Sequence, residues 1–188
     1  MQILGISGSL RQGSHNLDLL RAAAVELPPA ARFEVWEGLR AVPPYDQDQD
    51  QDPGADDPTV RDLRDSIGRS DGLVIATPEY NGSVPGQLKN ALDWASRPFL
   101  DNSLGGKPVA VIGTSTGLFG AVWAQAELRK VLATIGADVI DEELPVGRAH
   151  EAFDANGQLR DPDLRAHLAG LMSALVRQMG TPVENLAA

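Results

Sequence analysis

The chain has 188 residues, a formal net charge of −10 and no cysteine. This length can bury the core of one α/β domain, and the lack of cysteine excludes a disulfide framework, a thiolate metal site and a cysteine nucleophile. The negative charge argues against nucleic acids and anionic membranes as partners, because binding to either draws its affinity from clustered lysine and arginine. Neither a basic leader nor a long apolar stretch opens the chain, so we expect a cytoplasmic protein without a membrane span.

Short apolar runs alternate with amphipathic helical patterns along the chain, which is typical of βαβ units around a parallel sheet. The apolar runs predict five strands, at residues 2–6, 33–36, 73–77, 108–114 and 137–140. Apolar residues at helical spacing, and Asp-Pro pairs that suit a helix start, predict five helices. These helices are expected at about residues 14–27, 57–67, 84–95, 119–135 and 161–179, the last ended by Gly180 and Pro182.

Two segments fall outside this alternation. Residues 37–57 contain a run of alternating Asp and Gln at 46–52 without an apolar face, which predicts a solvated acidic loop. Residues 181–188 are expected to form a tail. Since no linker divides the chain, we expect a single domain over residues 1–188.

Five parallel strands with helices on both faces most often take the order 2-1-3-4-5, the flavodoxin-like three-layer sandwich. In this α/β fold, ligands bind where the winding direction changes, between the carboxyl ends of the first and third strands. The loops after these strands, residues 7–16 and 78–83, are therefore the places to look for a binding site.

The first of these loops has the composition of a phosphate site. Backbone N–H groups and the positive end of a helix dipole attract an anion there. The hydroxyls of Ser9 and Ser14 can donate to phosphate oxygens, and Arg11 can add a charge-assisted contact. The loop lacks both the Walker A ending and the Gly-x-Gly-x-x-Gly fingerprint, which favours a phosphate monoester over a pyrophosphate. The alternative is an ordinary Ser/Gly-rich capped turn, and His15 is given no role.

The loops after the third and fourth strands are turns rich in backbone amides, which could line a slot for a planar heteroaromatic ring such as isoalloxazine. Tyr80 is either a wall of that slot or a packing lid. We expect Glu79 to cap a helix or to contact another subunit rather than to act as a general base. Hydride transfer to a flavin depends on alignment more than on proton removal.

Two segments resemble the NADPH-dependent FMN reductase family, which includes bacterial chromate, quinone and azo-dye reductases. They are GSLRQGSHN at residues 8–16 and PEYNGSVPGQLKNALDWASRP at residues 78–98, and the resemblance continues to about residue 145. It implies that the FMN phosphate is held by Ser9, Arg11, Ser14 and Asn16. The ribityl chain and ring would be lined by Pro78, Glu79, Tyr80 and Asn81, and the pyrimidine side would be bordered by Ser115, Thr116 and Gly117.

The resemblance also implies the reaction. Hydride would pass from NADPH or NADH through bound FMN to a small acceptor such as a quinone, an azo dye, chromate or a free flavin, with no catalytic side chain beyond the flavin itself. Relatives in the family are dimers or tetramers, so a homodimer or homotetramer is expected, with Arg97 at an interface or beside the flavin. Residues 120–123 depart from the pattern of many relatives, which have a second small residue and an arginine there.

Three other classes of protein are alternatives to a reductase: an electron carrier, a phospho-receiver domain and a metal hydrolase. A flavodoxin-like electron carrier would bind FMN without meeting the nicotinamide directly. A phospho-receiver domain would need acidic residues where the chain has Ser7 and Thr77. The three histidines lack the spacing of metal ligands, so no metal is expected. No residue identifies a preference between NADH and NADPH.

Overall fold

The structure, a computed structural model, describes residues 1–52 and 57–180. Its elements in chain order are β1 (Gln2–Ser7), α1 (His15–Val25), β2 (Arg32–Trp36), the 3-10 helix η1 (Gly38–Ala41), α2 (Gln47–Gln51), α3 (Pro58–Arg69), β3 (Gly72–Thr77), α4 (Gly86–Ala95), β4 (Pro108–Thr114), α5 (Val122–Ile135), β5 (Asp138–Val139), β6 (Pro145–Val146), α6 (Ala149–Ala152) and α7 (Pro162–Met179).

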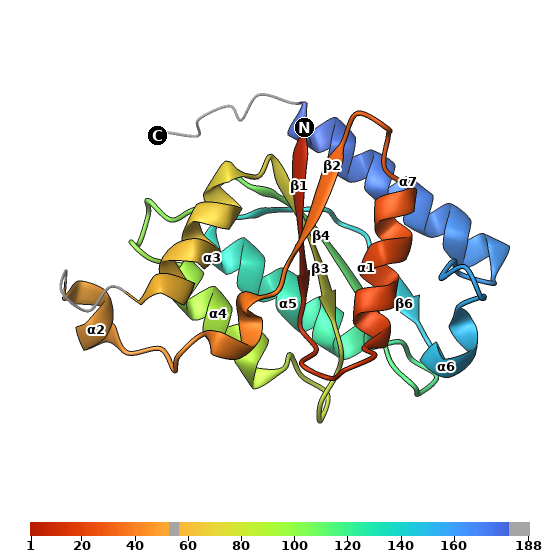
Figure 1. Ribbon diagram of the computed structural model, residues 1–188, viewed down its shortest axis with the longest axis horizontal. Helices are drawn as coiled ribbons and strands as arrows, with labels where there is room; N and C mark the ends of the chain where they lie inside the picture. Colours follow the sequence, from red (N-terminus) through yellow and green to blue (C-terminus); the bar gives the residue numbers. More distant parts are fainter. Residues whose placement is uncertain (53–56, 181–188) are drawn as a thin grey trace.

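The strands form one parallel sheet in the order β2-β1-β3-β4-β5, which confirms the predicted flavodoxin-like topology. Every residue of β3 and β4 is buried. Both strands are rich in Val, Ile and Ala, as expected of central parallel strands that are covered on both faces. The winding direction changes at β1 and β3, and both strands end at the lower edge of the sheet in Figure 1.

Helices cover the two faces of the sheet in separate layers (Figure 1). On one face, buried side chains of α3, α4 and α5 form a core with the side chains of β1, β3 and β4 that point toward this face. On the other face, α1 and α7 form the second core. Because all the strands are parallel, the loops that follow β1, β3 and β4 lie at the same, carboxyl edge of the sheet, where they can build a site together.

Helix starts agree with the predicted capping residues where the caps are local. The carboxylate of Asp57 accepts hydrogen bonds from Thr59 N and Val60 N, and Asp161 caps α7 in the same way. The predicted start of α5 at residue 119 is wrong, because Gly120 and Ala121 have positive φ and the helix begins only at Val122. The helix predicted from residue 84 begins at Gly86.

The prediction that residues 37–57 form a solvated loop is wrong for the part before the acidic run. Leu39 and Val42 are buried in the core against α3 and α4. The backbone carbonyl oxygens of Leu39, Val42 and Pro43 accept hydrogen bonds from side chains of α4, and these bonds hold the segment against that helix. Side chains of another helix supply these bonds, so the local sequence could not reveal them.

The acidic run itself is partly structured. It includes α2, whose first turn is capped by the Asp46 carboxylate. The Asp50 carboxylate lies 2.6 Å from the Arg64 guanidinium of α3. Residues 53–56 and the predicted tail at 181–188, which includes Pro182, lie outside the described residues.

The edge of the sheet beside β4 differs from the prediction of one strand at 137–140. Two short strands pair with β4 instead: β5 with its start and β6, which was not predicted, with its end. The residues between them include Asp141, Glu142 and Glu143, so charged side chains interrupt this edge. β6 pairs with Gly113 and Thr114, next to the loop after β4.

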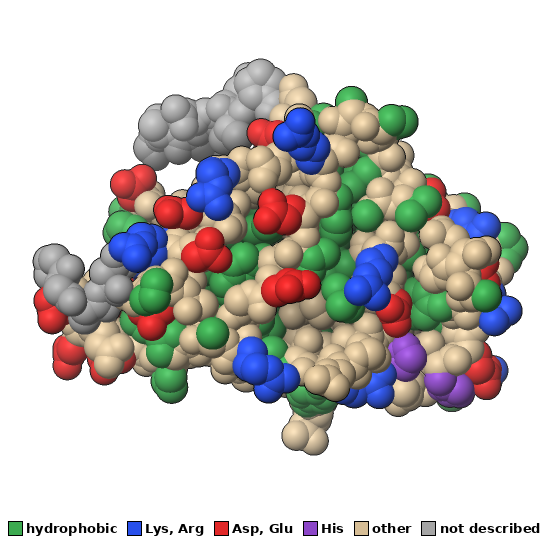
Figure 2. All heavy atoms as spheres, viewed as in Figure 1, with side chains coloured by type: hydrophobic (Ala, Val, Ile, Leu, Met, Phe, Trp, Pro, Cys, Tyr) green, Lys and Arg blue, Asp and Glu red, His purple; other side chains and the backbone are tan. Residues whose placement is uncertain are grey.

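On the face of the molecule shown in Figure 2, charged side chains of the two signs are interspersed, with Lys and Arg side chains lying singly among Asp and Glu side chains. Within the described ranges, no group of three or more His, Asp or Glu side chains is placed to hold a metal ion. None of the helices in these ranges is long and apolar enough to cross a bilayer.

Candidate cofactor-binding site

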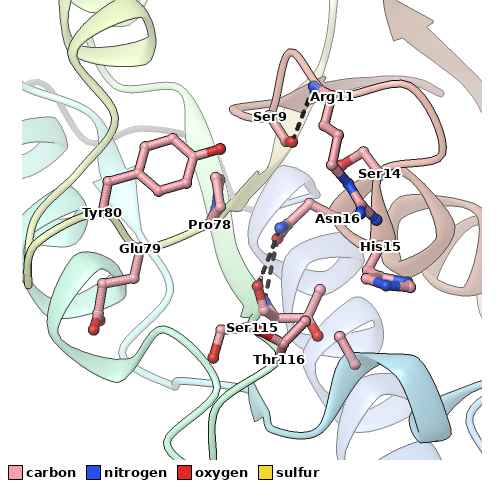
Figure 3. Close-up of a pocket in the computed structure, with 12 residues that line it drawn as sticks. Ser9, Arg11, Ser14, His15, Asn16, Pro78, Glu79, Tyr80, Ser115 and Thr116 are labelled. Carbon is pink, nitrogen blue, oxygen red and sulfur yellow. Dashed lines mark hydrogen bonds between the residues drawn. The ribbon is translucent and has the colours of Figure 1, made fainter.

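A cleft of about 260 Å³ lies where the loops after β1, β3 and β4 meet (Figure 3). Nine of the eleven predicted site residues line it, namely Ser9, Arg11, Ser14, Asn16, Pro78, Glu79, Tyr80, Ser115 and Thr116. Asn81 and Gly117 are not among its lining residues. Three loops that are far apart in the sequence therefore meet at the edge predicted from the strand order.

Ser14 is the most unusual polar side chain in the cleft. It stands at the N-cap position of α1, yet its hydroxyl makes no capping hydrogen bond. The residue is 4% exposed, and its Oγ is buried without a hydrogen-bond partner among the described residues. Buried hydroxyl groups in proteins are almost always hydrogen-bonded. The Ser14 hydroxyl therefore marks a position where an atom of a bound ligand would supply the hydrogen-bond partner.

The remaining polar groups of the first loop are arranged around the same helix start. Ser9 Oγ accepts a hydrogen bond from Arg11 N at 3.4 Å, so the hydroxyl proton of Ser9 stays available to a ligand. One guanidinium nitrogen of Arg11 donates to Gly13 O at 2.6 Å, which holds this exposed side chain beside the loop. A cation, two hydroxyl groups and the N-terminus of α1 together suit an anion such as a phosphate.

Gly8 allows the first loop to pack closely against the second. Its N–H donates to Ala76 O at 2.8 Å. A Cβ at this position would lie 2.8 Å from Leu88 Cδ2 and 3.2 Å from Pro78 Cδ, closer than carbon atoms normally approach. The missing side chain therefore lets the loop after β1 and the Pro78 side of the cleft meet.

Asn16 connects the first loop to the third. Its side-chain Nδ2 donates to Thr114 O, and its Oδ1 accepts from Thr114 N, both at 3.1 Å (dashed lines in Figure 3). The residue is 4% exposed and both polar atoms of its amide are used in this pair of bonds. Its position at the cleft therefore ties the start of α1 to the end of β4.

The loop after β3 forms a tight hairpin. Tyr80 and Ser83 pair as an antiparallel bridge, with N–H···O distances of 3.1 and 3.2 Å in the two directions. Asn81 and Gly82 both have positive φ, as a type I′ turn requires, and Asn-Gly is the preferred sequence for that turn. The phenol ring of Tyr80 stands at one side of the cleft with the residue 54% exposed. Asn81 thus shapes the turn that presents Tyr80.

The prediction that Glu79 caps a helix is confirmed. Its Oε2 accepts hydrogen bonds from the backbone N–H groups of Trp123 and Ala124, each at 3.1 Å. These two groups lie in the first turn of α5, whose own N-cap residue is Ala121 and offers no side-chain acceptor. Both hydrogen bonds go to the Oε2 atom, so this oxygen is engaged in capping α5, which favours a capping role over a general-base role.

The loop after β4 is held by a segment that the sequence did not single out. Ser115 N donates to Val146 O at 3.2 Å, and Ala149 N donates to Ser115 O at 3.0 Å. Arg148 N donates to Gly117 O at 2.8 Å. Gly117 is therefore not part of the lining, but its carbonyl oxygen anchors the segment from β6 to α6.

The structure adds Thr114, His15 and Ala149 to the lining of the cleft. The His15 ring stacks on Phe153, with ring centroids 6.5 Å apart and planes 8° apart. Thr114 could have been expected, since it ends β4 at the carboxyl edge. No pattern in the sequence signals Ala149, because its place depends on the pairing of β6.

The sequence pattern of the NADPH-dependent FMN reductase family matches residues 1–151. The chain belongs to this family. It is 39% identical to an NAD(P)H-dependent FMN reductase of Pseudomonas aeruginosa, with 93% of each chain covered. It is 41% identical to a 2-hydroxy-1,4-benzoquinone reductase of a Burkholderia species, with 92% of each chain covered.

Solved structures agree with this assignment to the NADPH-dependent FMN reductase family. FerB, a flavoenzyme NAD(P)H:(acceptor) oxidoreductase from Paracoccus denitrificans, superposes with a TM-score of 0.82 at 35% identity, over 95% of this chain and 97% of FerB. A flavodoxin from Pseudomonas aeruginosa shares the fold at a TM-score of 0.59 and 14% identity. The predicted class is confirmed: the chain is an oxidoreductase that uses FMN, with NAD(P)H as co-substrate.

Proposed function

We propose that this reductase binds the FMN phosphate at the start of α1 and passes electrons from NAD(P)H to quinones. The observation that carries the proposal is the Ser14 hydroxyl, which is buried at the cleft and has no partner among the described residues. A phosphate oxygen would satisfy it, and Arg11 and the Ser9 hydroxyl stand in the same loop to share the negative charge. The donor set fits a phosphate monoester.

Each side of the cleft has a part in this proposal. Asn16 keeps the first and third loops in register through Thr114, so that the phosphate end and the ring end of the cleft stay aligned. Pro78 and Tyr80 provide apolar walls for a planar ring, and Ser115 and Thr116 offer polar groups along the opposite side. Bound FMN would supply the capacity to accept hydride and release two electrons.

Quinones are proposed as acceptors because relatives that match nearly the whole chain carry that activity in their names. These include the Burkholderia enzyme and a quinone reductase of Escherichia coli, which is 37% identical over 93% of each chain. The wall residue Tyr80 is 54% exposed, so the cleft is open on this side to a flat aromatic acceptor.

The decisive experiment is an anaerobic titration in two halves. Protein loaded with FMN is mixed with NADPH or NADH, and the loss of flavin absorbance is followed; benzoquinone is then added and the return of absorbance is recorded. Bleaching followed by recovery supports the proposal. A loaded protein that does not bleach with either nucleotide would be an electron carrier, and a protein that stays colourless with excess FMN would refute the phosphate site.

We also propose a cytoplasmic homo-oligomer. Leu118 and Phe119, in the loop after β4, and Trp123, in the first turn of α5, are exposed by 66%, 63% and 53%, and Phe119 packs edge-on against Trp123. Apolar side chains grouped in this way favour burial against another protein surface, here a second copy of the chain. Light scattering coupled to gel filtration would give a mass of twice or four times 20.0 kDa if the proposal holds. Trp123→Ser should then lower that mass.

A further inference from the structure

The start of α5 has an unusual capping arrangement. The first N–H groups of a helix have no partner within the helix and need acceptors from elsewhere. Ala121, in the left-handed conformation, is the N-cap residue and has no polar side chain. Glu79 takes its place from the loop after β3, accepting from Trp123 N and Ala124 N at 3.1 Å each. The cap of this helix is therefore a residue that also lines the cleft.

A second carboxylate joins the same two elements in the reverse direction. Glu127 lies one turn further along α5, and its Oε2 accepts from the Ser83 hydroxyl at 2.6 Å and from Val84 N at 3.0 Å. These hydrogen bonds lower the pKa of Glu127, which keeps the carboxylate charged. The loop after β3 is thus fastened to α5 at both ends of its hairpin. We call Glu79, Glu127 and their four partner groups the α5 clamp.

Between the two fastening points, the backbone of the hairpin is bonded to itself through Tyr80 and Ser83. A Cβ added at Gly82 would meet no atom within 4 Å, so the tip of the turn is open to solvent. Tyr80 is 54% exposed, and its backbone bonds run to Ser83 within the same hairpin. An isolated two-stranded hairpin is at best marginally stable in water. The position of Tyr80 at the cleft therefore depends on contacts outside the hairpin.

We propose that Glu79 and Glu127 are positioning residues that hold the Tyr80 hairpin against α5 and so keep the wall of the cofactor cleft in place. Neither carboxylate needs to touch the cofactor for this role; each acts through the backbone N–H groups that it fixes. The inference rests on the proposed function, because the cleft must bind FMN for the wall to matter.

The test compares four variants of the full chain with the wild type. Glu79→Ala removes the cap, Glu79→Gln keeps one neutral acceptor oxygen, and Glu127→Gln weakens the second fastening point. Glu142→Gln makes the same change of charge on an exposed side chain near His167, away from the cleft. Amide hydrogen exchange is measured without FMN, and the Kd for FMN is measured by quenching of its fluorescence.

Glu79→Ala should speed exchange at the amides of Trp123 and Ala124 and raise the Kd for FMN about tenfold, the effect of losing charge-assisted bonds that fix one wall. Glu79→Gln should recover a large part of that affinity, since its amide oxygen still accepts a hydrogen bond. Glu127→Gln should raise the Kd less than Glu79→Ala does, and Glu142→Gln should match the wild type. A purely structural role would instead lower apo stability and leave the Kd of the folded protein unchanged.

The outcomes separate this inference from the proposed function. Unchanged exchange at the two amides in Glu79→Ala would show that the cap is absent, and the inference would fail. Faster exchange with wild-type FMN affinity would likewise overturn the positioning role while leaving the proposed function intact. Failure of the wild type itself to bind FMN would refute the proposed function and the positioning role together, even if the exchange data showed the cap.

Discussion

Replacing Ser14 with alanine should have opposite effects on the apo-protein and on its complex with FMN. The hydroxyl is buried and unpartnered among the described residues, and it makes no capping bond to α1. Its removal from the apo-protein therefore breaks no hydrogen bond and removes a polar group that is poorly accommodated. In the complex, the same change would remove a donor to the phosphate.

The magnitudes follow from the two environments. An unsatisfied buried polar group costs about 1–3 kcal/mol, part of which alanine recovers, so the apo-protein should gain roughly 0–1 kcal/mol. A hydrogen bond to a charged group contributes about 1.5–3 kcal/mol, so FMN affinity should fall by about ten- to a hundredfold. Without a role in ligand binding, the change would be nearly neutral in both states.

The assay pairs urea unfolding of the apo-protein with FMN titration of the same preparation. Ser103→Ala is the matched control, because Ser103 Oγ is also buried without a partner but does not line the cleft. This control should show a similar small change in stability and wild-type affinity for FMN. Linear extrapolation gives the free energy of unfolding in each case.

Two results would refute the reasoning. If Ser14→Ala destabilised the apo-protein by more than about 1 kcal/mol, the hydroxyl would have a protein partner, as an ordinary N-cap does. If FMN bound to Ser14→Ala as tightly as to the wild type, the phosphate would lie elsewhere. Equal losses of affinity in Ser14→Ala and Ser103→Ala would point to a general effect of stability.

Three further predictions follow from single contacts. Arg11→Ala should weaken FMN binding by about 1.5–3 kcal/mol in a fluorescence titration, with partial recovery in Arg11→Lys, and unchanged affinity would remove Arg11 from the site. Gly120→Ala should lower the free energy of unfolding by about 2 kcal/mol or more in urea, because φ is +57° and the new Cβ would lie 2.4 Å from backbone atoms of β6. Gly68→Ala, with no atom within 4 Å of the new Cβ, should be neutral or stabilising and serves as its control. Hydrogen bonds from Ser83 and Val84 lower the pKa of Glu127, so the stability that this carboxylate contributes is present above pH 4.5 and is lost as the pH falls through the lower pKa of the folded state. Glu127→Gln should therefore reduce the loss of unfolding free energy at acidic pH. An unchanged loss at acidic pH would show that Glu127 does not contribute in this way.

Local chemistry determined much of the fold before any tertiary contact was known. The Asp-Pro starts of α3 and α7 carry their own capping carboxylates, and the uniformly apolar runs of β3 and β4 have no stable place except the centre of a sheet. The topological preference for the order 2-1-3-4-5 then predicted a binding site at the loops after β1 and β3, where the structure has a cleft.

Predictions failed where the stabilising partner is remote in the sequence. Leu39 and Val42 are buried by α3 and α4, and their segment looks polar only because an acidic run follows it. β6 is two residues long and exists through its pairing with the end of β4. The start of α5 depends on Glu79, more than forty residues earlier in the chain.

The sequence by itself determined where the main strands lie, the composition of the loop after β1 and membership in a family of FMN reductases, because each of these depends on residue types at short spacing. Only the tertiary structure decided how those loops are held. The side-chain amide of Asn16 is hydrogen-bonded to the backbone of Thr114, Glu79 caps α5, and the Ser14 hydroxyl is buried without a hydrogen-bond partner among the described residues. These outcomes depend on which polar groups remain unmatched after the chain has packed, and that is a property of distances across the fold rather than of any one segment.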